Sequence, residues 1–116
     1  MDLWYRGALE IAAAIRARDI SSVECLDLYF NRVNRFNPAL NAIVVFDMES
    51  ARDAARMADA AVAAGEATGP LHGVPITVKE SFDLAGHPST FGRPDRRDHK
   101  ADRDALVVER LKAAGA

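Results

Sequence analysis

The stretch GPLHGVPITVKESFDLAGHPSTFG, residues 69–92, carries the clearest structural signal in this chain. Two turns built on Gly and Pro lead into a short run of apolar residues, which predicts a strand over residues 76–80. Side chains alternate between the two faces of a strand, so Lys79 is expected on the face opposite Ile76 and Val78. A lysine therefore lies near the end of an otherwise apolar strand.

The segment that follows, residues 82–104, is dense in Gly, Pro, Asp and Arg. This composition predicts a loop with at most short strand pieces. Long loops within a domain usually carry function or mobility, so the segment is a candidate wall of a site. A last helix is predicted to start at Asp102 or Asp104 and to end near a Gly115 C-cap.

Three helices are predicted upstream from the spacing of apolar residues. The first covers residues 6–18. The second starts at a capping box formed by Ser21 and Glu24 and stops at Asn37, because the residue before a proline avoids the helical region. The third is rich in alanine, covers residues 49–64 and is capped by Asp47.

A further strand is predicted over residues 41–46, NAIVVF, because the run is rich in β-branched residues and is bounded by polar ones. Helices and strands therefore alternate along the chain. With 116 residues the chain has room for one domain at most.

Composition excludes several classes of protein. Fifteen Lys and Arg against 17 Asp and Glu leave a net charge of −2, which excludes binding to nucleic acid by bulk charge. The sequence shows no apolar run long enough to cross a membrane and no signal peptide. One cysteine, Cys25, excludes an internal disulfide, and a cytoplasmic location is expected.

The residues that could carry chemistry are few. The three histidines have neither helical i, i+4 spacing nor a cysteine partner, so no metal or organic cofactor is expected. Lys79 is the candidate catalytic residue, because a lysine on an apolar strand either extends to water or lies desolvated, where it becomes a base. The pattern by itself leaves both alternatives open. The histidines are His72, His87 and His99.

Residues 69–92 closely resemble the start of the amidase signature family of Ser–cis-Ser–Lys hydrolases. The resemblance extends to Asn41-Ala42, to the alanine-rich helix and to LKAAGA at residues 111–116, so it covers nearly all of the chain. The sequence departs from the family at Glu80, where aspartate is usual. It departs again at Ser89 and Arg93, where threonine and serine are common.

The resemblance implies an α/β fold, namely the N-terminal part of an α/β/α sandwich around a mixed sheet, incomplete in this chain. It also implies a role for Lys79, which would hydrogen-bond a serine held on a cis peptide. That serine would deprotonate a second serine, whose attack on a small-molecule amide gives an acyl-enzyme. Lys79 is then the catalytic base.

Neither serine of such a triad is expected within this chain, because both lie downstream of the lysine in the family. We therefore expect residues 1–116 to be the N-terminal fragment of a single amidase domain that supplies only Lys79 and is inactive by itself. Unpaired strand edges predict self-association or a homodimer. Two alternatives remain, namely a non-catalytic helix-rich interaction module and a subunit of a tRNA-dependent amidotransferase.

Overall fold

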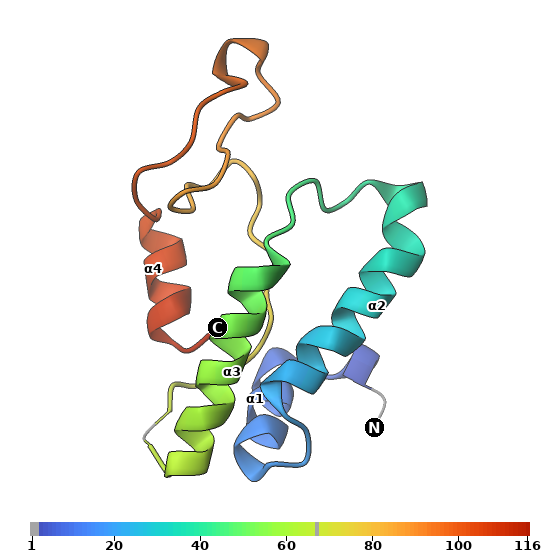
Figure 1. Ribbon diagram of the computed structural model, residues 1–116, viewed down its shortest axis with the longest axis vertical. Coiled ribbons are helices and arrows are strands. Elements are labelled where there is room, and N and C mark those ends of the chain that lie inside the picture. Colours follow the sequence, from blue (N-terminus) through green and yellow to red (C-terminus); the bar gives the residue numbers. More distant parts are fainter. Residues whose placement is uncertain (1–2, 67) are drawn as a thin grey trace. The chain divides into compact units, whose positions relative to one another are not determined.

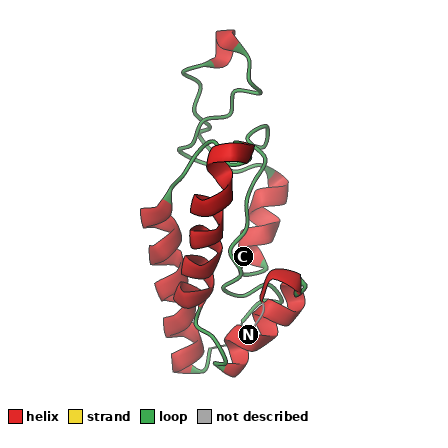
Figure 2. Ribbon diagram, turned by 90° about the vertical axis from the view of Figure 1, so that its right-hand side faces the viewer, coloured by secondary structure: helices red, strands yellow, loops and turns green. Residues whose placement is uncertain are grey.

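The computed structural model describes residues 3–66 and 68–116. The chain divides into two compact units. The first reaches to Pro75 and includes Ala114–Ala116, and the second is Ile76–Ala113. Figure 1 shows the course of the chain, and Figure 2 shows helices and loops in the described residues.

In its described residues, the first unit contains a short 3-10 helix and three α-helices. The 3-10 helix is Leu3–Tyr5, and the α-helices are α1 (Ala8–Ala17), α2 (Ser22–Leu40) and α3 (Met48–Ala64). All three helices predicted from spacing are therefore confirmed. The core gathers one face of α1, the start of α2 and the loop before residue 76, through Leu3, Ile11, Ala12, Ile15, Cys25 and Val74.

The start of α2 is held by two sets of hydrogen bonds. The predicted capping box is confirmed, since Ser21 Oγ accepts the Glu24 N–H at 3.0 Å and Glu24 Oε2 accepts the Ser21 N–H at 2.9 Å. A second cap comes from α3, where the Asp59 carboxylate accepts the N–H groups of Ser22 at 2.6 Å and Val23 at 3.2 Å. Asp59 thus ties α3 to the first turn of α2.

The predicted end of α2 is wrong. The helix continues through Pro38 to Leu40, and Asn41 ends it in the left-handed region with φ 47°. The Asn37 side chain explains the difference, because its amide donates to the Ile43 carbonyl and its oxygen accepts the Ile43 N–H, both at 2.9 Å. These bonds stabilise the last turn despite the N–H that Pro38 lacks.

Helix α3 begins and ends as predicted. Asp47 caps it by accepting the Ser50 N–H at 3.1 Å, and Gly65 ends it with φ 71°. Its alanine-rich stripe packs against α2, with Ala55 as its buried member. Small side chains permit this close approach of the two helices.

The predicted strands over residues 41–46 and 76–80 do not form within residues 3–66 and 68–116, where Pro88 and Lys100 make an isolated β-bridge. A strand needs a neighbour to pair with its backbone, and the N–H groups of Val44, Val45 and Phe46 find no acceptor among the described residues. The sheet of the α/β expectation is therefore not confirmed within the described residues, which form helices and loops.

The end of the chain returns to the turn at residues 69–73. The Leu71 N–H donates to the Ala114 carbonyl at 2.9 Å, and the Gly73 N–H donates to the Gly115 carbonyl at 2.8 Å. A Cβ atom on Gly69 would lie 2.2 Å from the Ala114 oxygen, so only glycine fits there. Two segments that carry the family resemblance, residues 69–92 and 111–116, are thus hydrogen-bonded to each other.

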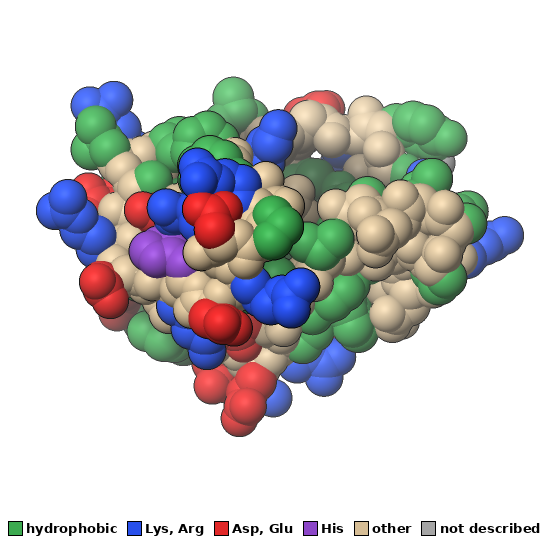
Figure 3. Space-filling view, turned by 90° about the horizontal axis from the view of Figure 1, so that it is seen from above, with side chains coloured by type: hydrophobic (Ala, Val, Ile, Leu, Met, Phe, Trp, Pro, Cys, Tyr) green, Lys and Arg blue, Asp and Glu red, His purple; other side chains and the backbone are tan. Residues whose placement is uncertain are grey.

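The second unit consists of a long loop, a 3-10 helix at Pro94–Arg96 and helix α4, Leu106–Ala113. The loop predicted over residues 82–104 is confirmed. The predicted aspartate cap of α4 is wrong, because Asp104 instead accepts the Ala85 N–H at 2.8 Å and the Lys112 ammonium at 2.6 Å. On the face seen in Figure 3, positive and negative side chains are interspersed.

Candidate active site

Lys79, the predicted catalytic residue, lies in the second unit at the start of a tight turn. Its carbonyl accepts the Phe82 N–H at 2.9 Å, so residues 79–82 form a hydrogen-bonded turn. Its side chain is exposed and has no hydrogen-bond or ion-pair partner within the described residues. The site around the ammonium is therefore open to water.

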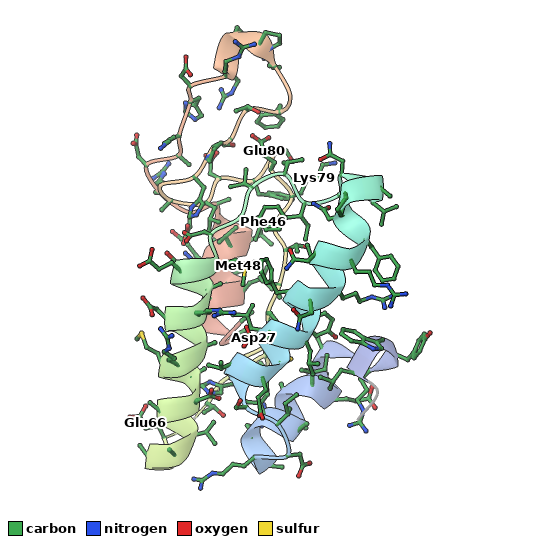
Figure 4. The ribbon with its side chains drawn as sticks, turned by 45° about the vertical axis from the view of Figure 1, so that its right-hand side comes forward. Asp27, Phe46, Met48, Glu66, Lys79 and Glu80 are labelled. Atoms are coloured by element: carbon green, nitrogen blue, oxygen red, sulfur yellow. The ribbon has the colours of Figure 1, made fainter. Side chains whose placement is uncertain are left out.

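Glu80, the next residue, is fixed by two backbone donors. Its Oε1 accepts the Thr90 N–H at 2.6 Å, and its Oε2 accepts the Phe91 N–H at 2.9 Å. Hydrogen bonds from Thr90, and then from Phe91, lower the pKa of Glu80 below its usual value. Lys79 and Glu80 are both labelled in Figure 4.

The turn that receives Glu80 is fixed from its other side by Arg96. The Arg96 guanidinium donates from Nε at 3.3 Å and from Nη2 at 3.1 Å to the Ser89 carbonyl, and it lies 5.6 Å from the centre of the Phe91 ring. The Ser89 N–H in turn donates to the His99 carbonyl at 3.2 Å. Glu80 and Arg96 therefore hold residues 89–91 between them.

Sequence reasoning missed this role of Glu80, which stood out only as a departure from the family pattern. The signal that could have found it is weak, namely a carboxylate at the second position of a turn followed by a Gly-rich loop. Because the Glu80 carboxylate accepts N–H groups about ten residues away, no periodic pattern in the sequence predicts the contact.

Within the described residues, no serine hydroxyl is hydrogen-bonded to Lys79. Ser21 and Ser50 lie at helix starts, and Ser22 is buried in α2. Ser89 is also buried, and its hydroxyl has no hydrogen-bond partner in the described part of the chain. None of these serines is in a position to act as the nucleophile that Lys79 would activate.

The rings of two histidines, His72 and His87, contact backbone carbonyls. His72 Nε2 lies 2.9 Å from the Ala58 carbonyl, and His87 Nδ1 lies 2.9 Å from the Ala85 carbonyl. Over residues 3–66 and 68–116, no three His, Cys, Asp or Glu side chains are placed to share a metal ion. In the same residues, no helix is both long and apolar enough to cross a membrane.

A hollow of about 340 Å³ lies along the C-terminal half of α2, and Lys79 is not among its lining residues. Its lining is mostly apolar, and the charged group in it is Arg32, whose guanidinium lies 5.1 Å from the centre of the Trp4 ring. The lining residues are Tyr29, Arg32, Val33, Phe36, Asn37, Leu40, Ala42 and Ile43.

Comparison with known proteins assigns the chain to a protein family. Residues 24–116 match the family model described as Amidase. The chain belongs to the amidase signature family, and the resemblance seen in the sequence is confirmed.

Individual relatives support the assignment of the chain to this family. The chain is 46% identical over 114 residues to an indoleacetamide hydrolase of Bradyrhizobium diazoefficiens. It is also 46% identical over 107 residues to a subunit of the glutamyl-tRNA(Gln) amidotransferase of Azoarcus sp.. The solved structure of a bacterial aryl acylamidase of the amidase signature family superposes with a TM-score of 0.87 at 25% identity.

These relatives are much longer than the matched segment. The alignments cover 98% and 92% of this chain but 22% of each curated relative. The superposition covers 97% of this chain and 24% of the acylamidase chain. The chain therefore spans about a quarter of the length of the relatives it matches.

Proposed function

We propose that Lys79 is the general base of an amidase that hydrolyses the carbon–nitrogen bond of a small-molecule amide. The observation that carries the proposal is membership of the amidase family over a segment that contains the lysine-bearing motif GVPITVKES. Of the ionisable side chains in that motif, the one of Lys79 is exposed and has no hydrogen-bond or ion-pair partner within the described residues. A general base must be able to accept a proton from its serine partner, so its amine must not already be held by another group.

The proposed reaction uses a Ser–cis-Ser–Lys triad. The neutral Lys79 amine takes the proton of a bridging serine as that serine takes the proton of the nucleophile. The nucleophile forms an ester with the acyl group, and the carbon–nitrogen bond breaks as the leaving amine takes up a proton. Water then hydrolyses the ester. Both serines would come from polypeptide beyond the 116 residues, as would the strands that complete an α/β/α sandwich around a mixed sheet.

The exposure of Lys79 supports the further proposal that these residues by themselves are inactive. A lysine base must be neutral, and exclusion of water is what favours the neutral amine. The same exposure is what the alternative of a non-catalytic interaction module predicts. The relative that belongs to an amidotransferase favours a second candidate function, a subunit of a tRNA-dependent amidotransferase.

An assay of the purified chain tests this first. We expect no hydrolysis of simple aryl and alkyl amides above the rate in buffer, with or without Lys79→Ala. Hydrolysis that copurifies with the chain and disappears in Lys79→Ala would contradict the proposed division of the triad. Hydrolysis that persists in Lys79→Ala would contradict the role of Lys79 as the base.

We also propose that the chain self-associates through a second copy at its unpaired segment 44–46. Val44, Val45 and Phe46 are exposed by 60%, 40% and 48%, and their N–H groups lack acceptors within the described residues. Exposed apolar segments with unpaired backbone N–H groups can pair with a segment of another chain. Light scattering should give a mass above that of the monomer, and a monomer with a sharp cooperative thermal transition would contradict the proposal.

A further inference from the structure

We propose that Glu80 is a positioning residue that fixes the backbone of Lys79 against the turn at residues 89–92. The inference rests on the proposed function, in which Lys79 is the base. It goes beyond that function because it assigns a role to the neighbouring carboxylate. It also names the groups through which that carboxylate acts, the backbone N–H groups of Thr90 and Phe91.

Glu80 is placed to control Lys79 because both belong to one turn. The hydrogen bond from the Phe82 N–H to the Lys79 carbonyl makes Glu80 the second residue of that turn. Any rotation of the turn that redirected Lys79 would also withdraw the Glu80 carboxylate from its donors. Two oxygens on two separate N–H groups, at 2.6 and 2.9 Å, restrict such rotation more than one bond would.

The receiving turn is preorganised to present these two donors. Phe91 and Gly92 both have left-handed backbones, with φ 57° and 67°. Thr90 Oγ1 accepts the Gly92 N–H at 3.2 Å, and Arg96 holds the Ser89 carbonyl. Consecutive N–H groups in such a turn form an anion-binding concavity, and Glu80 fills it.

The segment before Glu80 has no sheet to hold it in this chain. The N–H groups of Ile76, Thr77 and Val78 have no hydrogen-bond acceptor within the described residues. Among the described hydrogen bonds of the second unit, Glu80 is the residue of 76–80 whose side chain takes part. The hydrogen bonds of the Glu80 carboxylate therefore set the position of Lys79 within the second unit, Ile76–Ala113.

The experiment uses the 116-residue chain and needs no catalytic activity. The chain has three lysines, Lys79, Lys100 and Lys112, whose amines can be labelled by reductive methylation with ¹³C and followed by NMR. Amide exchange of Thr90 and Phe91 is measured in parallel. The variants are Glu80→Gln, which keeps size but removes charge, and Glu80→Asp, which keeps charge. Glu109→Gln, an exposed carboxylate on α4, is the matched control.

We expect Glu80→Gln to speed exchange at Thr90 and Phe91 by at least about tenfold, since hydrogen bonds to a charged acceptor are strong. The Lys79 methyl resonance should shift while that of Lys112 stays in place. Glu80→Asp should keep slower exchange than Glu80→Gln, and Glu109→Gln should match the unmodified chain. In a pH titration, the chemical shift of the Lys79 methyl resonance should also change at acid pH, as Glu80, whose charged neighbour is Arg96, becomes protonated. This change should be absent in Glu80→Gln.

Two results would overturn the inference. Exchange at Thr90 and Phe91 that is equally fast with and without the Glu80 carboxylate would show that the contact does not persist. A Lys79 resonance that is unmoved while exchange accelerates would show that Glu80 orders the loop without positioning Lys79. Neither result bears on whether Lys79 is the base, which depends on amide hydrolysis.

Discussion

Gly73 packs directly against Ser22 in the first unit, where a Cβ atom on Gly73 would lie 2.1 Å from the Ser22 Oγ and 3.3 Å from Ile15 Cγ2. The backbone of Gly73 is also left-handed, with φ 73°. Glycine is therefore required at this point of the GPLHG turn for two reasons, space and conformation.

Gly73→Ala should lower the free energy of unfolding by at least about 2 kcal/mol, from backbone strain together with overpacking of the core. Chemical denaturation measures the change. Gly65→Ala is the matched control, because Gly65 has a similar φ of 71° but no atom within 4 Å of the added Cβ. Equal losses in the two variants would show that contact with Ser22 costs nothing.

Asp59→Ala should destabilise the first unit by about 1–3 kcal/mol, because two N–H groups at the start of α2 lose their acceptor. Asp53→Ala on the same helix is the control. Asp53 pairs with Arg56 on the surface at 2.8 Å, and exposed pairs of this kind contribute about 0–1 kcal/mol. In thermal unfolding, Asp59→Ala should lower the midpoint temperature more than Asp53→Ala does. The reverse order would contradict the cap that Asp59 of α3 provides to α2.

Cys25 should be unreactive in the folded chain. Burial raises the pKa of its thiol to about 11, and its side chain has no exposed surface. The thiolate is the reactive form, so labelling at pH 8 with a disulfide reagent should be far slower in buffer than in denaturant. Equal rates in the two solutions would show that α2 opens readily in the native chain.

Asp104 should contribute stability that is lost in acid. Its pKa is lowered first by the Lys112 ammonium and then by the N–H of Ala85. A carboxylate with a lowered folded pKa stabilises the fold above its unfolded value of 3.8, and the contribution disappears as pH falls through the folded pKa. Lys112→Ala should raise the Asp104 pKa in a carboxyl NMR titration. An unchanged titration would contradict the ion pair.

The local helical structure could be predicted from the sequence because its causes are local. Apolar spacing, the Ser21 and Glu24 capping box, Asp47 and Gly65 act within one or two turns of the helices they define. The end of α2 was missed because the Asn37 side chain bonds Ile43 beyond the proline, which overrides the usual effect of Pro38.

Whether the predicted strands pair, and what surrounds the site, could not be predicted in this way, because both depend on distant partners. Residues 76–80 have the composition of a strand, but a ladder needs a neighbour, and none lies within the described residues. The role of Lys79 as base is predicted by the resemblance to the amidase signature family, whereas the pattern by itself leaves it open. The contact of Glu80 with residues 90 and 91 depends on how a long loop folds back, which no periodicity records.

The most direct test of the central claim is a chimera in which this chain replaces the matching 22% of indoleacetamide hydrolase from Bradyrhizobium diazoefficiens. The chimera should hydrolyse indoleacetamide, and Lys79→Ala should lower kcat/KM by at least about 100-fold, as loss of a general base does. Lys112→Ala, outside the site, should leave kcat/KM nearly unchanged. An active chimera whose kcat/KM is the same with Lys79→Ala would contradict the account.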